Sequence, residues 1–282
     1  MATPAPFSRF EFLIAWRYLR ARRAEGGVSV MTWISFLGIM LAVMALIATL
    51  AVRSGFRYEF VGTILGANPH ISVYDQVEMT ASGMADRRLE NFAPIAAAVA
   101  GVPGVVHAAP VIRGQVMATH RGRNAGVEVI GIAGEDLARV PLVANPERQE
   151  GDIARFADGV AIGSGVAREL GLSVGESIRL ISPDGARTAF GTSPRVGAYE
   201  VVYIFQVGRW DIDRIRVYMP FAEAQSYFNR DGVADEIEVI VENPEEVNAL
   251  IFPVLQAAGG DVTLWTWQDS SGAFLQALQM ED

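Results

Sequence analysis

The sequence of 282 residues contains no cysteine, and that absence removes several kinds of site at once. Disulfide frameworks and thiolate metal sites both require cysteine, as does a lipid anchor attached through a thiol. The fold therefore depends on a packed core. Hydrophobic residues make up 51% of the chain and charged residues 20%, which is enough apolar material for one or two folded domains.

Lysine is also absent, because all 23 basic residues are arginine. A phosphate-binding loop of the G-x-x-x-x-G-K-[ST] type needs its lysine to reach the terminal phosphates of a nucleotide. Any ATP hydrolysis must therefore come from a partner. The formal net charge of −9 argues against a nucleic-acid binder, which needs a basic face to offset phosphate repulsion.

Signals for a metal or a nucleophile are equally sparse. The histidines are scattered, at His70, His107 and His120, and none lies in an H-E-x-x-H motif or at metal-ligand spacing. Gly163-Ser164-Gly165 lacks the G-x-S-x-G spacing of a nucleophile turn, and Ser164 instead suits the N-cap of a following helix. The sequence predicts no metal site and no cofactor in this chain.

Two acidic pairs have spacings that could suit acid–base catalysis. Asp211 and Asp213 alternate as residues of a strand do, whereas Glu245 and Glu246 open a predicted helix, where acidic residues favour the helix dipole. Both pairs are therefore interpreted as structural or solvated. The chain is predicted not to be an enzyme.

An apolar run without any charge extends from Val28 to Val52. It exceeds the roughly 20 apolar residues needed to cross a hydrocarbon core ~30 Å thick. A cleaved signal peptide is the alternative, but its apolar core runs only about 7–15 residues. We expect a transmembrane helix.

Charge predicts the orientation of this helix. Five arginines and two glutamates precede it, a local balance of +3, namely Arg9, Arg17, Arg20, Arg22 and Arg23 against Glu11 and Glu25. The positive-inside rule then places the N-terminus in the cytoplasm. The part after Val52 carries −12 and is expected outside the cytoplasm, which means the periplasm if the protein comes from a bacterium with two membranes.

The stretch FSRFEFLIAWRYLRARR before the run sets apolar residues on one helical side and arginines on the other. This pattern predicts an amphipathic helix in the inner membrane interface. A simple cytoplasmic extension of the span is the alternative.

After the run, Arg53 to Leu65 keeps an apolar stripe and is predicted to be a helical stalk that ends before Asn68-Pro69. The rest mixes strands and helices and predicts an α+β fold. Strands are expected at 70–74, 113–119, 127–132, 177–181, 199–207, 236–241 and 262–267, with a short one from Val160 and another ending at Met219-Pro220. Helices are expected at 94–99, up to Leu170, at 221–227, at 244–258 and at 269–282, the last with Asp269 as its N-cap.

Between two of these strands lies Ser182 to Ala198, which is rich in glycine and proline and carries Arg187 and Arg195. Two β-rich segments joined by such a stretch predict a long projecting hairpin.

Six segments in this order resemble the lipoprotein-releasing permease family of the LolC/LolE type. They are AWRYLRARR, WISFLGIMLAV, GFRYEF, ILGANPHISVY, VAIGSGVARELGLSVGESIRLISP and the final W-x-x-x-x-x-x-F-L-Q-A-L-Q-M-E. The resemblance covers essentially the whole chain. It implies a type VII ABC transporter permease with one span, then a two-lobed, MacB-like periplasmic domain with porter-like and sabre-like lobes.

Together these expectations divide the chain into five parts. They are residues 1–27 as the interfacial helix, 28–52 as the span, 53–69 as the stalk, 70–268 as the periplasmic core with a sabre-like lobe at about 150–232, and 269–282 as a helix leading to a second span. The family has three further spans, so the sequence is expected to be a piece of a longer protein.

The resemblance also implies the partners. Two permease subunits, in a homodimer or heterodimer, work with cytoplasmic ATPase subunits of the LolD type, which bind ATP and Mg. The assembly lifts mature lipoproteins from the inner membrane and passes them to a periplasmic chaperone of the LolA type. No cofactor is expected in this chain itself.

In the family a protruding periplasmic hairpin captures the chaperone, and Pro183 to Arg195 matches its position here. The expected contact residues are Pro183, Asp184, Gly185, Arg187, Phe190, Pro194 and Arg195. A proline-bounded loop loses less entropy on docking, and arginines suit the carboxylates of a partner. A variable, solvated hairpin is the alternative.

The outer part of the span offers adaptable and small residues where acyl chains of the cargo could lie. They are Met44, Ile47, Ala48, Ala51 and Phe56. Residues of these types also suit positions that face lipid or pack against another helix.

Two other functions stay open from the sequence alone. A related permease of the same architecture could drive efflux or activate a cell-wall hydrolase by mechanical motion. A single-span periplasmic scaffold protein would need no ATPase.

Overall fold

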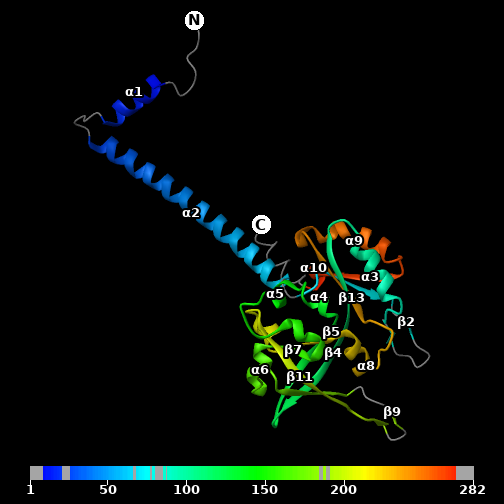
Figure 1. The fold of residues 1–282 in the computed structure, drawn as a ribbon. Helices are drawn as coiled ribbons and strands as arrows, with labels where there is room; N and C mark the ends of the chain where they lie inside the picture. Colours follow the sequence, from blue (N-terminus) through cyan, green and yellow to red (C-terminus); the bar gives the residue numbers. More distant parts are fainter. Residues whose placement is uncertain are drawn as a thin grey trace. The chain divides into compact units, whose positions relative to one another are not determined.

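The structure is a computed structural model that describes residues 9–20, 26–65, 68–76, 78–79, 85–86, 88–183, 187–188 and 191–270. Its internal contacts divide the chain into two compact units, Met1–Val61 and Gly62–Asp282. Each unit is described by itself (Figure 1).

The first unit is helical. Helix α1 runs from Arg9 to Arg20, and α2 runs from Gly26 to Leu65. The segment Val30–Gly55 has a mean hydropathy of 2.5 and none of it is buried, so it is long and apolar enough to cross a membrane. The predicted span and stalk are thus one continuous helix, and it ends before Asn68-Pro69 as predicted.

The second unit begins with a four-stranded antiparallel sheet in the order β14-β1-β13-β4. Its strands are β1 (Ile71–Asp75), β4 (Val105–His120), β13 (Glu236–Val241) and β14 (Val262–Thr266). Helices α3 (Phe92–Ala100) and α9 (Val247–Ala257) lie side by side and pack on it (Figure 1). Val99 of α3, and Val247 and Val254 of α9, are fully buried.

Strand β4 continues beyond this sheet into a ring of strand pairs. The pairs run β4-β5, β5-β12, β12-β7, β7-β11 and β11-β8, and β8 pairs back onto β4 through Met117–Thr119. The additional strands are β5 (Arg123–Ile132), β7 (Val160–Gly163), β8 (Ser177–Ser182), β11 (Arg195–Gln206) and β12 (Arg216–Pro220). Because the pairing closes on itself, the ring has two faces, an inner and an outer one.

Alternate residues of all six ring strands join one apolar cluster with α6 (Ser164–Leu170) and α8 (Phe221–Tyr227). On β5, for example, Val127 and Val129 belong to this inner cluster, whereas Ile130 and Ile132 belong to a second cluster. That outer cluster is covered by α4 (Gly134–Leu137), α5 (Pro141–Ala144), the 3-10 helix η1 (Ile153–Asp158) and α7 (Trp210–Asp213).

Smaller elements complete the described part of the chain. They are β2 (Glu78–Met79) paired with β3 (Ala85–Asp86), β6 (Arg148–Gly151) at the edge of β11, β9 (Arg187–Thr188) paired with β10 (Gly191–Thr192), η2 (Pro244–Glu246) and α10 (Trp267–Ser270).

The α+β class is confirmed, and most predicted elements are present. Helix α8 and strand β13 have the predicted bounds, whereas β4 is much longer than the predicted strand at 113–119. The expected helix at 244–258 is divided into η2 and α9. Nothing was predicted for 133–158, where the elements are each only a few residues long and show no periodicity.

Two predicted helix caps were wrong. Asp269 is not the N-cap of α10, because Thr266 precedes that helix, and the two residues form a reciprocal capping box. The Asp269 carboxylate accepts from the Thr266 N–H at 2.8 Å, and Thr266 Oγ1 accepts from the Asp269 N–H at 3.3 Å. Residues 271–282 of that predicted helix lie outside the described residues.

Ser164 is likewise the first residue of α6 and not its cap, which is Gly163. A Cβ at Gly163 would lie 2.2 Å from the carbonyl oxygen of Asp213, so glycine allows α7 to approach. Asp213 and Asp211 were predicted to alternate on a strand, and this was also wrong because both lie in α7. Asp213 is buried and accepts the N–H of Val207 at 2.9 Å.

Substitution by alanine is predicted to have different effects on stability at two glycines of β5. A Cβ at Gly131 would lie 2.1 Å from Cβ of Ala224 on α8, whereas a Cβ at Gly126 meets no atom within 4 Å. We expect Gly131→Ala to lower the free energy of unfolding by about 1–3 kcal/mol through overpacking. Gly126→Ala is the matched control and should change little. Thermal unfolding of the two variants in detergent measures the difference, and equal stability would contradict this packing.

Candidate functional site

The predicted hairpin is present in the second unit. Strands β8 and β11 pair from Ser177↔Glu200 to Ser182↔Arg195, and beyond that point β9 pairs with β10. The ribbon that carries β9 leaves the ring at this end (Figure 1). Asp184, Gly185 and Phe190 lie outside the described residues.

The remaining predicted hairpin residues differ in their surroundings. Pro183 and Pro194 are exposed at the base of the hairpin. Arg187 is the first residue of β9, and the structure describes its backbone but not its side chain. Arg195 is half-buried, and its guanidinium donates to the carbonyl oxygens of Ser226 and of Tyr227, the latter at 3.0 Å. Arg195 therefore holds the hairpin base against the C-terminal end of α8.

The predicted acyl-chain residues lie on α2. Met44, Ile47, Ala48 and Ala51 are exposed, and their i, i+3, i+4, i+7 spacing puts them on one face of the helix. Phe56 is within α2, but the structure does not describe its side chain.

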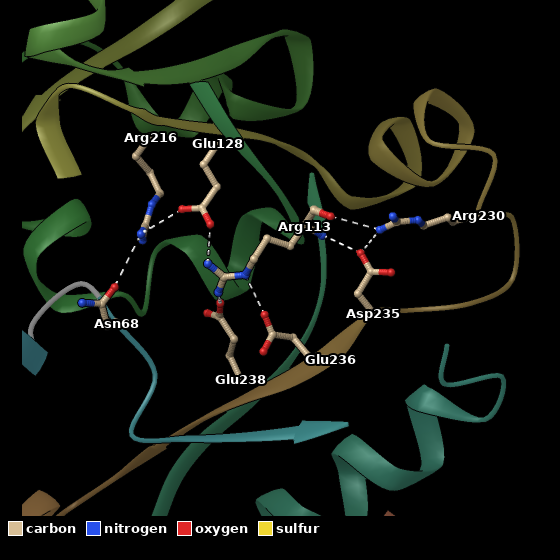
Figure 2. A network of polar contacts seen from close by, with 8 residues as sticks. All are labelled: Asn68, Arg113, Glu128, Arg216, Arg230, Asp235, Glu236 and Glu238. Atoms are coloured by element: carbon tan, nitrogen blue, oxygen red, sulfur yellow. Dashed lines mark hydrogen bonds and ion pairs between the residues drawn. The ribbon is translucent and has the colours of Figure 1, made fainter. Parts of the chain in front are cut away.

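A network of charged side chains lies where the four-stranded sheet and the ring share β4 (Figure 2). The sequence did not predict this network. Its centre is Arg113 on β4, whose guanidinium reaches three carboxylates on two other strands. The distances are 3.0 Å to Glu128 on β5, and 2.7 Å to Glu236 and 2.5 Å to Glu238 on β13. One arginine thus joins a ring strand to a strand of the four-stranded sheet.

A second arginine extends the network. Arg216, at the start of β12, is buried and lies 3.1 Å from the other oxygen of Glu128. Its Nη2 also donates to Oδ1 of Asn68 at 3.5 Å, as Figure 2 shows. Asn68 belongs to the short connection between α2 and β1, so the network includes the chain that leaves the long apolar helix.

The third arginine fixes the other side of Arg113. Asp235 accepts the backbone N–H of Arg113 at 2.7 Å and pairs with Arg230. Arg230 also donates to the carbonyl oxygen of Arg113 at 3.1 Å. The backbone of β4 is therefore held at the residue whose side chain joins the sheets.

Burial and charge act in opposite directions on these carboxyl groups. Burial alone would raise the pKa of Glu128, but Arg113 and Arg216 outweigh it, so this pKa lies below its usual value. Burial dominates at Glu238 and raises its pKa despite Arg113. Burial, together with Glu236, raises the pKa of Tyr74 to about 12. The two arginines thus hold Glu128 in its charged form.

The histidines do not come together. His70 is buried, its Nδ1 accepts the N–H of Val241 at 3.0 Å, and burial lowers its pKa to about 4. Nε2 of His107 lies 3.1 Å from Oδ1 of Asp136, and Nδ1 of His120 lies 2.9 Å from the carbonyl oxygen of Ser177. No group of three potential ligands that could hold a metal ion occurs among the residues that the structure describes.

One sequence signal could have revealed the network. Glu236 and Glu238 alternate within the otherwise apolar strand EIEVIV, so both carboxylates point to one face of a strand that is largely buried. Buried carboxylates require cationic partners, and arginine is the only basic residue type in this chain. The arginines that pair with these carboxylates are determined by the order of the strands in the sheet, which could not be predicted from the sequence.

Comparison with known proteins gives the following similarities. The family model of the MacB-like periplasmic core domain matches residues 32–256. The chain is 26% identical over 275 residues to the lipoprotein-releasing system transmembrane protein LolC of Neisseria meningitidis serogroup B, which covers 96% of this chain and 64% of that protein. It is 23% identical over 275 residues to the lipoprotein-releasing system transmembrane protein LolE of Haemophilus influenzae, which covers 95% of this chain and 64% of that protein. The chain thus spans less than two thirds of the length of these relatives.

Among solved structures, the chain is similar to the periplasmic region of MacB from Actinobacillus actinomycetemcomitans, with a TM-score of 0.46 and 9% identity. That similarity covers 77% of this chain and 95% of the solved chain.

Two of the three glutamates of the network are predicted to differ in the cost of neutralising them. We expect Glu128→Gln to lower the free energy of unfolding at pH 7 by about 3–5 kcal/mol, because it leaves the buried charge of Arg216 without its carboxylate. Glu238→Gln should cost less, because burial already disfavours the charge at that position. Chemical unfolding of both variants in detergent measures the two costs. A larger cost at Glu238 would contradict this view of the network.

The cost at Glu128 should also depend on pH. Its pKa is lowered in the folded protein, so its carboxylate stabilises the fold above its unfolded pKa of about 4.3, and that contribution is lost as pH falls through the folded value. The difference between the wild type and Glu128→Gln should therefore shrink as the pH is lowered below about 4. A difference that stays constant from pH 7 to pH 3 would argue against a charged Glu128.

Proposed function

Because the chain belongs to the family of the MacB-like periplasmic core domain, we propose that it is a permease subunit of an ABC transporter that releases lipoproteins from the inner membrane. The observation that carries this proposal is the extent of similarity to proteins named LolC and LolE. It covers 95–96% of this chain, including the long apolar helix and the hairpin region. The whole transporter passes its cargo to a periplasmic chaperone.

The proposed location is the inner membrane of a two-membrane bacterium, with the N-terminus in the cytoplasm and Gly62–Asp282 in the periplasm. The apolar segment Val30–Gly55 supports a span, and the arginines that precede it support this orientation. The acidic remainder of the chain is consistent with an extracytoplasmic domain.

ATP hydrolysis is assigned to a separate cytoplasmic ATPase that binds ATP and Mg, because the chain has no lysine for a phosphate-binding loop. A second permease subunit completes the assembly. This chain then contributes binding and motion, and no catalytic residue.

The hairpin is the proposed chaperone contact. Its β9–β10 ribbon extends beyond the ring, where a partner can reach it, and its two prolines are exposed. Arg195 stays a proposed contact, although its guanidinium also holds α8. Arg187, on β9, is the other basic residue of the hairpin that we assign to the partner.

The exposed face of α2 that holds Met44, Ile47, Ala48 and Ala51 is the proposed path of the acyl chains. Its small and flexible side chains suit a ligand of variable shape.

The hairpin assignment predicts the effect of reversing one charge. We expect Arg187→Glu to weaken capture of the purified chaperone about tenfold, because a rim charge that faces a partner carboxylate becomes repulsive. A pull-down from detergent extract of the full-length protein with its ATPase measures the capture.

The control is Arg148→Glu on β6, which makes the same charge change at the opposite end of β11. It should leave capture unchanged. Equal capture by the wild type and by Arg187→Glu would remove this residue from the contact, and capture that survives deletion of residues 184–192 would refute the hairpin role.

The acyl-chain assignment predicts a difference between two faces of one helix. A photo-crosslinking residue at Met44 or Ile47 should capture lipoprotein, whereas the same residue at Leu46, on the opposite face of α2, should capture several-fold less. Crosslinks are measured in membranes that contain the whole transporter. Capture of phospholipid alone at Met44 and Ile47 would contradict a cargo path on this face.

A further inference from the structure

The connection between α2 and β1 contacts both parts of the second unit. Covalently, this connection leads into β1, whose pairing partners are β13 and β14 of the four-stranded sheet. Asn68, within the connection, instead contacts Arg216 on β12, which belongs to the ring. The ring is also the part from which the hairpin extends. One side chain thus gives the exit of the long helix a direct contact with the hairpin-bearing ring.

The chain is fixed immediately after Asn68. The His70 N–H donates to the carbonyl oxygen of Val239 at 2.9 Å, and His70 Nδ1 accepts the N–H of Val241 at 3.0 Å. The His70 carbonyl oxygen accepts the N–H of Trp267 at 3.0 Å, where the last described helix begins. From His70 onward the chain therefore belongs rigidly to the sheet, and Asn68 lies between that sheet and the end of α2.

Arg216 is fixed to the ring much more firmly than to Asn68. It is paired with Glu128 both as an ion pair at 3.1 Å and as the register partner of Glu128 between β12 and β5. The contact with Asn68 is a hydrogen bond to a neutral amide at 3.5 Å, which is at the long limit of such bonds. A strong link on one side and a weak, reversible link on the other is the arrangement that a contact needs if it is to be made and broken repeatedly.

We propose that Arg216 is a positioning residue that makes the hairpin-bearing ring follow the connection after α2, through its contact with Asn68. Glu128 then carries the displacement into β5, so that the ring shifts relative to the four-stranded sheet. This role rests on the proposed transport function, in which an ATPase moves the helix that precedes the connection. It assigns to the Asn68–Arg216 contact the coupling of that motion to the hairpin.

Substitution of Asn68 tests this role better than substitution of Arg216, whose loss would leave Glu128 buried beside one arginine fewer. Asn68→Leu keeps the size of the side chain and removes the acceptor, and Asn68→Asp keeps the acceptor and adds a charge that strengthens it. The two variants therefore differ in their ability to hold Arg216. Thermal unfolding of both should stay near that of the wild type.

The readout is the distance between spin labels on the two parts of the second unit, and these 282 residues contain no native cysteine that would take a label. Ser173→Cys labels the ring, and Gln256→Cys on α9 labels the four-stranded sheet; both positions are exposed. The full-length protein with its ATPase, in lipid nanodiscs, is measured by pulsed electron resonance with and without a non-hydrolysable ATP analogue. ATP hydrolysis and chaperone capture are measured on the same samples.

We expect the analogue to change the label distance in the wild type and in Asn68→Asp, and Asn68→Leu to lose at least half of that change. ATP hydrolysis should stay within about twofold and chaperone capture should be unaffected, because neither requires the contact. A full distance change in Asn68→Leu, or no change in the wild type, would overturn the role of Arg216. Failure of the wild type to capture chaperone would instead count against lipoprotein release, while the distances still decide the role of Arg216.

Discussion

Arg113 lies at the only strand that the sheet and the ring share among the described elements, and its guanidinium is held by carboxylates from both. Strand β4 also joins the two parts through its backbone. The charges are largely buried, so each one would be costly without its partner. That cost makes the network demanding of geometry, because Glu128, Glu236 and Glu238 are satisfied together in one relative position of the two parts, which is the position that the proposed displacement leaves. Apolar packing could hold the parts together, but it would tolerate sliding more readily than these directional contacts.

The apolar cores surround this network without replacing it. The inner cluster of the ring and the outer cluster under α4, α5 and η1 stabilise the ring by itself. The helices α3 and α9 stabilise the four-stranded sheet. Between them, the arginines also reach the connection after α2 through Asn68. The same contacts that define the relative position of the two parts therefore also reach the segment by which the proposed membrane helix acts on them.

Much of the fold could be predicted from the sequence, because periodicity is a local property. The uncharged run predicts α2, the alternation in EIEVIV predicts β13, and Asn68-Pro69 predicts the end of the long helix. What could not be predicted depends on pairing over long distances. Arg113 and Glu236 are far apart in the sequence, and only the pairing of β4 with β13 brings them together. The same limit explains why the hydrogen bond from Arg195 to α8 was not predicted, although the sequence predicts Arg195 as a contact residue of the hairpin. It also explains the short elements of 133–158, which are ordered by the outer cluster and have too few residues to show a period.

The central claim is that the whole protein releases lipoproteins, and reconstitution tests it most directly. Full-length protein and its ATPase are placed in proteoliposomes with a labelled mature lipoprotein, and transfer to soluble chaperone outside is followed after ATP is added. The account predicts release that requires both ATP and the chaperone. Sustained ATP hydrolysis with all of the lipoprotein retained in the membrane would contradict it.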